Sequence, residues 1–302
     1  MHHKKQHFVP ASYLKAWCDK TSPSNHEPYV WVFPKSGGEA KRKSPEKIFR
    51  ETDFYTIKRI DRERDLVLEK GLSWLESQFA ALRQKKLGQR KPLNFRDKSV
   101  LCTFVAAMFA RTKSRREFIR EQWQEVLDLG NEVAEWTKNA APEEIKRMSL
   151  ALHPTPNEGR SMSMNDVKNI VDNPMQSFLV TGIATVAPAL FDMRFGILDT
   201  SNTPAFISSD NPCVWFDPDL FKRPSPFGAG GLISPSIEIS LPLSPTQFIL
   251  FGRKLLLSGL YVSIKTNDPL VDAINRRTWK YSDESFIADQ NYASFSWLPK
   301  SA

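Results

Sequence analysis

The order of hydrophobic patterns along the chain constrains the fold more than any single motif does. Between residues 61 and 191, apolar residues recur at steps of three and four, which is typical of helices that bury one face. The clearest such stripe consists of Leu68, Leu72, Leu75, Phe79 and Leu82. From Met193 onwards the pattern changes to short aromatic and β-branched runs separated by Pro, Gly and Asp, which predicts strands.

Two further strands are expected before residue 60, at YVWVF (Tyr29–Phe33) and DFYTI (Asp53–Ile57). Strands at both ends of the chain therefore enclose a helical middle. This order predicts an α+β fold in which the helical region packs on a mixed or antiparallel sheet, built from the C-terminal strands and an N-terminal hairpin. We expect all 302 residues to form one domain, with an N-terminal helix and hairpin in residues 1–60, helices in 61–191 and a sheet-rich region in 192–302.

Local signals predict several helix ends. Asn94 is expected to cap a helix that runs to about Asn139, with a break near Gly130. Asn165 is expected to cap a later helix. The last helix is predicted from Asp268 to Lys280, and the FIAD segment after it is expected to close the sheet.

Composition narrows the functional classes. The net charge of +8 favours polyanionic partners such as nucleic acid. Three scattered cysteines without CxxC spacing indicate buried thiols in a reducing compartment, not a zinc cage. The opening MHHKKQ is not followed by an apolar leader, and the apolar run from Pro174 to Phe191 is interrupted by polar residues, which favours a buried helix over a membrane span. We therefore expect a cytoplasmic protein without a membrane partner; the sequence does not indicate its oligomeric state.

The opening stretch QHFVPASYLKAW places a histidine directly before a short helix. Pro10 suits the first helical position, and Tyr13 and Trp17 share one face at a spacing of four. The positive end of this helix disfavours a charged His7, and a neutral imidazole can bind a metal or accept a proton. The alternative is a histidine that only anchors the terminus by one hydrogen bond.

A second group of candidates combines carboxylates with a buried arginine. Glu69 and Glu76 are seven residues apart beside the leucine stripe, where carboxylates can bind Mg²⁺ or Mn²⁺. Arg111 continues the apolar stripe of the next helix, and a buried arginine needs a carboxylate partner, which Glu76 or Glu69 could supply. A structural ion pair and a functional site would look alike at this level.

Basic residues and a strand end supply the remaining candidates. Twelve Lys or Arg residues lie between Arg83 and Arg120, Arg115 and Arg116 among them, and would bind phosphates if they shared one surface. In FISSDNPCVWF, Asp210 and Asn211 form a turn signal after a strand, a position from which sheets also present metal ligands and catalytic acids. The signatures of P-loop, dinucleotide-binding, zinc-protease and serine-hydrolase sites do not occur in the sequence.

Together these stretches resemble the bacterial domain-of-unknown-function family 4238. The matching elements, in the family's order, are QHFVPASYLKAW, DFYTI, the Glu69/Glu76 helix, FVAAMFART, FISSDNPCVW, ISLPLSP and VDAINRRTW. The positions that match the family's motifs are His7, Pro10, Glu76, Arg111, Asp210, Asn211 and Asn275. Lys113 stands where the family motif is expected to have proline. Members resemble stand-alone antiphage defence proteins, so the resemblance implies a toxic or abortive-infection effector without supplying a mechanism.

Two hypotheses follow from these residues. In the first, the protein is a metal-dependent nuclease, or a related phosphoryl-transfer enzyme, acting on RNA or single-stranded nucleic acid. His7 is then a ligand or base, and Arg111 holds a phosphate or stabilises developing charge. Glu69, Glu76 and Asp210 hold Mg²⁺ or Mn²⁺ or act as catalytic acid or base, and substrate is bound by Asn211, Asn275, Arg115 and Arg116. In the second, the protein is a non-catalytic sensor of a phage component, and the same residues form an internal hydrogen-bond network. An enzyme acting on a nucleotide or small metabolite is a third possibility.

Overall fold

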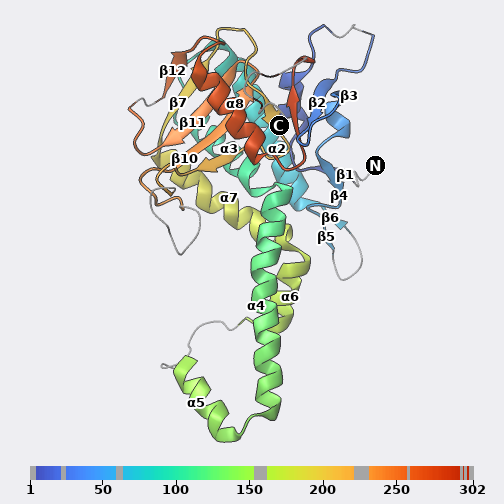
Figure 1. The fold of residues 1–302 in the computed structure, drawn as a ribbon, viewed down its shortest axis with the longest axis vertical. Coiled ribbons are helices and arrows are strands. Elements are labelled where there is room, and N and C mark those ends of the chain that lie inside the picture. The colour runs from blue at the N-terminus through green and yellow to red at the C-terminus, as the bar shows by residue number, and fades with distance from the viewer. Residues whose placement is uncertain are drawn as a thin grey trace.

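The computed structural model describes residues 5–21, 25–58, 64–152, 162–220, 231–256, 259–292, 295 and 298. Within them the chain forms an α+β body from which one long helix, α4, projects (Figure 1). The N-terminal part contains β1 (Lys5–His7), α1 (Ala11–Leu14), β2 (Val30–Pro34), β3 (Lys41–Lys43), β4 (Arg50–Thr52), β5 (Ile57–Lys58) and β6 (Arg64–Asp65), with short 3₁₀ turns at Lys15–Trp17 and Pro45–Lys47.

The middle of the chain is helical, as its periodicity predicts. Its helices are α2 (Val67–Lys85), α3 (Phe95–Ala110), α4 (Lys113–Asn139), α5 (Pro142–Leu152), α6 (Met164–Asp172) and α7 (Pro174–Asp192), with a 3₁₀ turn at Leu87–Gln89. The C-terminal part contains β7 (Arg194–Asp199), β8 (Ser208–Ser209), β9 (Val214–Phe216), β10 (Glu238–Ser244), β11 (Gln247–Gly252), β12 (Leu260–Ser263), α8 (Pro269–Tyr281) and β13 (Ser285–Ala288).

Two sheets form the body. The C-terminal strands make a five-stranded mixed sheet in the order β12-β7-β11-β10-β9, in which β12 runs parallel to β7 and the other pairs are antiparallel. The second sheet has the order β3-β2-β13-β8, so the FIAD strand does join the N-terminal hairpin to the C-terminal part. The prediction of an α+β fold with a mixed or antiparallel sheet is therefore confirmed.

One large apolar core joins segments that are far apart in the sequence. It contains the aromatic pair Tyr13 and Trp17, the α2 stripe, most of α3 and the inward-facing residues of β7, β10 and β11. The rings of Tyr13 and Trp17 lie 4.9 Å apart, as their spacing predicts. Pro10 is the N-cap of α1 and not its first helical residue.

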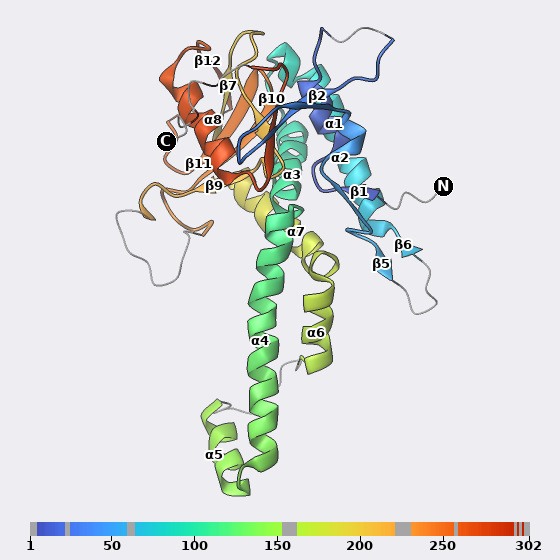
Figure 2. The ribbon, with the colours of Figure 1, turned by 45° about the vertical axis from the view of Figure 1, so that its right-hand side comes forward.

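The long helix α4 and its neighbours α5 and α6 form an arm that extends away from the body, and two views agree on this shape (Figures 1 and 2). α6 packs along α4, and α5 lies at the far end. Within the described residues, α7 is the one helix that is long and apolar enough to cross a membrane, but it packs against α3 of the body.

Several local predictions need correction. The predicted helix from Asn94 to Asn139 is interrupted at Arg111–Thr112 and continues through Gly130. Thr112 causes the restart, because its side chain accepts a hydrogen bond from the backbone of Arg115 and caps α4.

The cap of α6 and the DFYTI segment also differ from expectation. Ser163 forms a capping box with Asp166, so Asn165 lies inside the helix. DFYTI contains a turn at its centre and becomes a strand only at Ile57, because Asp53 adopts a left-handed backbone with φ 55°. The sequence FKRPSPFGAGG, whose Pro and Gly content predicts a loop, lies almost wholly outside the described residues.

Candidate functional site

Four predicted residues come together where β1, α2 and the end of α3 meet. Glu69 and Glu76 project from α2, Arg111 caps the C-terminus of α3, and His7 ends β1. The Arg111 Nη1 atom donates a hydrogen bond of 2.7 Å to Glu76 Oε1. The prediction that a buried Arg111 must have a carboxylate partner is thus confirmed, and Glu76 is that partner.

Arg111 is almost fully enclosed. Only 1% of its side chain is exposed, compared with 22% for the side chain of Glu76. Its Nη2 atom lies 3.4 Å from the sulfur of Met108, and its buried Nε atom has no hydrogen-bond partner among the described residues. An unpaired buried donor costs about 1–3 kcal/mol, which makes it a place where water or a ligand oxygen is favoured.

Glu69 is the second carboxylate of this cluster. Burial raises its pKa, and the negative charge of Glu76 raises it further, while Arg111 opposes both effects. Glu76 and Arg111 therefore lie near enough to affect the charge of Glu69, although Glu69 and Glu76 are separated by about 10 Å along the helix axis. Of the two carboxyl groups, that of Glu69 therefore takes up a proton more readily than a free glutamate does.

His7 is held in its neutral form with a defined tautomer. Burial lowers its pKa, more than the nearby Glu46 and Glu76 raise it. Its Nε2 atom lies 3.3 Å from the backbone oxygen of Pro45, so this nitrogen carries the proton and donates. Because the other nitrogen is then unprotonated, Nδ1 is available as a base or a metal ligand.

Two residues without an assigned role in the sequence hold this cluster together. Tyr55 donates from its hydroxyl to the backbone oxygens of His7, at 3.2 Å, and Arg111, at 3.4 Å. The side chain of Gln6 is fully buried and accepts from the Tyr55 backbone N–H at 2.6 Å. Tyr55 belongs to the DFYTI motif, so the sequence did indicate that this position matters. Gln6 directly precedes His7, and no pattern in the sequence indicates that it is buried.

Asp210 lies in a different arrangement. Its carboxylate accepts three backbone hydrogen bonds, from the N–H groups of Asp283, Glu284 and Ser285 at 2.7–2.9 Å. Burial raises its pKa, and those three donors partly reverse the effect. Asn211 donates to the Asp283 carboxylate and to the Ser114 hydroxyl at 3.4 Å each. Among the described residues, neither side chain has a polar contact with the Arg111 cluster.

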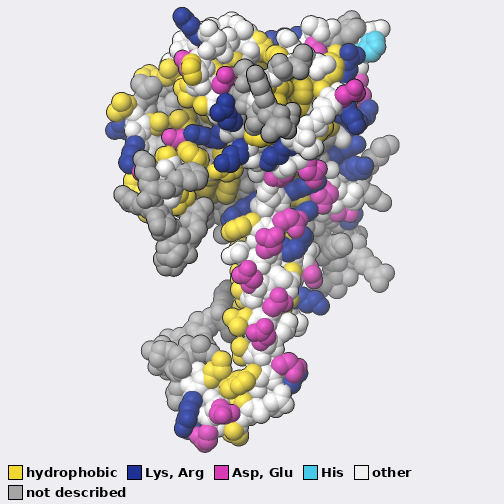
Figure 3. Space-filling view, viewed as in Figure 1, with side chains coloured by type: hydrophobic (Ala, Val, Ile, Leu, Met, Phe, Trp, Pro, Cys, Tyr) yellow, Lys and Arg dark blue, Asp and Glu magenta, His cyan; other side chains and the backbone are white. Residues whose placement is uncertain are grey.

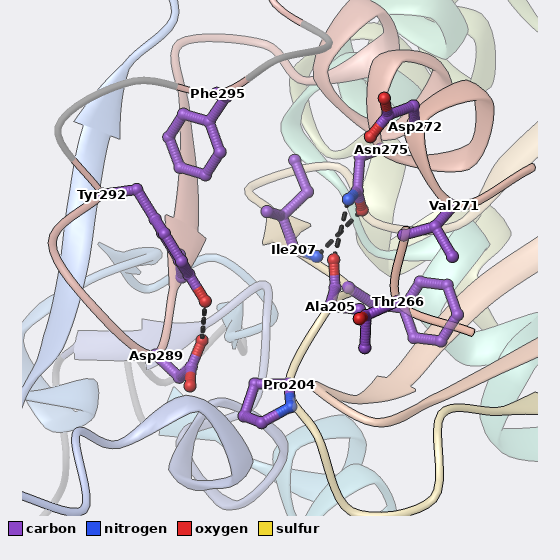
Figure 4. Close-up of a pocket in the computed structure, with 12 residues that line it drawn as sticks. Pro204, Ala205, Ile207, Thr266, Val271, Asp272, Asn275, Asp289, Tyr292 and Phe295 are labelled. Carbon is purple, nitrogen blue, oxygen red and sulfur yellow. Dashed lines mark hydrogen bonds between the residues drawn. The ribbon is translucent and has the colours of Figure 1, made fainter. Parts of the chain in front are cut away.

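The side chain of Asn275 is also hydrogen-bonded to backbone groups. Its side-chain oxygen accepts from the N–H of Ile207, and its amide donates to the oxygen of Ala205. It lines a cavity of about 180 Å³. Figure 4 shows Tyr292 and Asp289 on the opposite side of this cavity, where the Tyr292 hydroxyl donates to the Asp289 carboxylate. The cavity belongs to the junction of α8 and β13, not to the Arg111 cluster.

The basic stretch from Arg83 to Arg120 does not present one free cationic surface. Seven of its twelve members have an acidic partner or are bound to backbone oxygens: Arg83, Lys86, Arg90, Arg111, Lys113, Arg116 and Arg120. Arg116 binds both Glu51 and Glu117. Arg115 instead lies between the rings of Phe109 and Phe118, where burial lowers its pKa.

The positions predicted to bind metal are thus divided between two places. Glu69 and Glu76 interact, while Asp210 is held by the backbone before β13. In the part of the chain that the structure describes, no three His, Cys, Asp or Glu side chains are placed to hold one metal ion together. Mg²⁺, however, is commonly bound by one or two carboxylates together with water and substrate phosphates.

The fold and this site define an α+β protein in which a buried arginine binds one glutamate of a helix, close to the end of the N-terminal strand. The chain belongs to the family described as "Protein of unknown function (DUF4238)", whose model matches residues 5–291. No curated protein and no solved structure matches the chain.

Proposed function

We propose that this protein is a phosphoryl-transfer enzyme, a nuclease acting on RNA or single-stranded nucleic acid, and that it serves as an antiphage defence effector. The observation that carries the proposal is the convergence of His7, Glu69, Glu76 and Arg111 from three separate elements. Buried groups with altered pKa values beside a charge partner are typical of catalytic sites. The net charge of +8 suits a polyanionic substrate.

In this proposal each residue has a separate task. Glu69 and Glu76 would hold Mg²⁺ or Mn²⁺, directly or through water, and the metal would supply positive charge to stabilise the phosphate that reacts. Neutral His7 accepts a proton from the attacking hydroxyl or water at Nδ1. Arg111 is too enclosed to reach a bulky substrate, so it acts as a positioning residue that fixes the Glu76 carboxylate.

Cleavage assays test the proposal directly. Purified full-length protein is incubated with end-labelled single-stranded RNA, single-stranded DNA and duplex DNA, in Mg²⁺, in Mn²⁺ or with EDTA. We expect cleavage of a single-stranded substrate that requires the metal, and a loss of roughly 100-fold or more in rate for Glu76→Gln and Glu69→Gln. The Glu76→Gln variant can still accept the Arg111 hydrogen bond, and circular dichroism checks that it remains folded.

The matched control is Glu132→Gln, which removes an exposed glutamate from α4. It is expected to leave the cleavage rate unchanged. If the wild-type protein cleaves none of these substrates with either metal, the proposal that it is a nuclease is wrong.

The second candidate is a non-catalytic sensor of a phage component. It is favoured by the internal hydrogen bonds of Asp210 and Asn275, whose side chains are bound to backbone groups. A His7→Ala variant separates the two candidates in a phage plaque assay. The nuclease requires that this variant loses defence while remaining folded, whereas the sensor predicts defence at the wild-type level.

A further inference from the structure

A short basic strand precedes the segment whose backbone contacts His7. Lys41, Arg42 and Lys43 form β3, the outer strand of the sheet β3-β2-β13-β8, and all three side chains are exposed. An edge strand carries unpaired backbone groups, and its side chains point alternately to both faces of the sheet. A ligand that follows this edge therefore meets positive charge from both sides.

The positive charges of β3 are not neutralised. None of Lys41, Arg42 and Lys43 has an acidic partner among the described residues, in contrast to most of the arginines between Arg83 and Arg120. Arg42 instead lies over the rings of Tyr29 and Trp31, at 5.2 and 4.8 Å. This contact holds the guanidinium in place while its N–H groups remain free to bind an anion.

The strand leads directly to the candidate site. Ser44 and Pro45 follow Lys43, and the oxygen of Pro45 is the partner of His7 Nε2. Two residues span at most about 7 Å, so the last lysine of β3 lies close to the segment that holds His7. On the other side of His7, β1 pairs with β4, and the residue opposite His7 in the register is Arg50.

We propose that β3 is the binding track for a single-stranded nucleic acid, whose phosphates contact Lys41, Arg42 and Lys43 as the strand runs toward His7. This inference rests on the proposed function for its direction, and it names the surface that receives the substrate. Lys41 and Lys43 lie about 6.6 Å apart along the strand, a spacing that lets neighbouring phosphates of an extended chain each meet one lysine. A duplex is too wide to follow a single strand edge in this way.

Binding is measured without cleavage, so that the two proposals can fail separately. Fluorescence anisotropy of a labelled 20-nucleotide RNA is recorded in EDTA at several NaCl concentrations, with Glu76→Gln as the background. In that background the triple variant Lys41→Gln/Arg42→Gln/Lys43→Gln is expected to bind at least roughly tenfold more weakly near 0.1 M salt. The slope of log K against log salt should fall by about 2, since three phosphate contacts are lost on a single strand.

A matched control removes the same charges elsewhere. Lys85→Gln/Lys91→Gln/Arg96→Gln takes away two lysines and one arginine that are exposed and unpaired within the described structure. It should bind RNA as the background does. Equal weakening by both triple variants would show a diffuse charge effect and overturn the track.

Further arms exclude other anionic partners. Duplex DNA and vesicles containing phosphatidylserine are titrated in parallel. If either one binds more tightly than single-stranded RNA and its binding depends on β3, the proposal that β3 binds a single strand is wrong. If the wild type cleaves RNA while the β3 variant binds RNA as tightly as its background, the inference fails and the nuclease stands. If no substrate is cleaved but RNA binding depends on β3, the nuclease fails and the binding track stands.

Discussion

The body and the arm of this protein use polar residues in opposite ways. In the body, the charged side chains of the family motifs are buried and bound: Arg111 to Glu76, Asp210 to three backbone N–H groups. On α4 beyond Arg120, five acidic residues and one lysine remain exposed, and Figure 3 shows acidic side chains following the helix away from the body. The position of a charged side chain in this molecule, more than its residue type, thus decides how much it contributes to stability.

The arm also leaves apolar side chains exposed. Phe118, Val126, Leu129 and Trp136 are between 40% and 61% exposed on α4. Ile119 is the one buried residue of this 27-residue helix, so most single substitutions on α4 remove little packed surface. The comparison therefore predicts large effects for substitutions in the body and small effects for chemically equal substitutions in the arm.

The largest expected difference concerns two glutamates. Glu76→Ala removes the partner of a fully buried arginine and should lower the free energy of unfolding by about 3–5 kcal/mol. Glu132→Ala, on the exposed face of α4, should change it by less than about 0.5 kcal/mol. Urea unfolding followed by circular dichroism measures both. Similar values for the two variants would contradict the distinction between body and arm.

A pair of aspartates gives the next largest difference. Asp210 accepts hydrogen bonds from three backbone N–H groups. In Asp210→Asn, the side-chain NH₂ group faces at least one of these donors and cannot accept its hydrogen bond. We therefore expect the free energy of unfolding to fall by about 2–3 kcal/mol. Asp128→Asn affects one exposed bond from Gln124 on the same helix, with an expected loss of about 0.3–0.5 kcal/mol. Thermal unfolding of both variants at neutral pH makes the comparison.

The two regions also differ in how well they can be predicted from sequence. The α2 stripe, the C-terminal strands and the need of Arg111 for a carboxylate follow from periodicity and from the cost of buried charge. The break between α3 and α4 was not predictable from Gly130, because a glycine within a long helix costs only about 1 kcal/mol and packing can compensate for it. Thr112, a capping residue, was the better signal.

The convergence of site residues was predictable only in part. Glu69 and Glu76 share a helix face, so their interaction follows from spacing alone. Whether His7 or Asp210 joins them depends on how β1 and β13 are placed, which no local pattern encodes. The stretch from Arg83 to Arg120 illustrates the same limit, because most of its arginines find acidic partners through tertiary contacts. The segment KSGGEAKRKSPEK is typical of a basic turn by its Gly, Pro and Lys content, but the structure forms strand β3 within it.

A smaller effect is expected from the titration of His7. Its folded pKa is lowered by burial, so the folded state holds fewer protons than the unfolded state. The stabilisation is therefore present above the unfolded value near 6.5 and is lost as the pH falls through that value toward the folded pKa. Comparing unfolding at pH 7.5 and 5.5, His7→Gln should lose less stability than wild type does. His26→Gln, at an exposed position, should follow the wild-type profile.

The smallest effect is expected from a leucine of the arm. Leu129 is 61% exposed on α4, so Leu129→Ala removes little buried surface and should change the unfolding free energy by less than about 0.5 kcal/mol. The same substitution at Leu101, which is fully buried in α3, should cost about 2–5 kcal/mol because it leaves a cavity. A loss near 2 kcal/mol for Leu129→Ala would mean that the arm is packed in solution against something, and a concentration-dependent unfolding midpoint would identify that partner as a second copy of the chain.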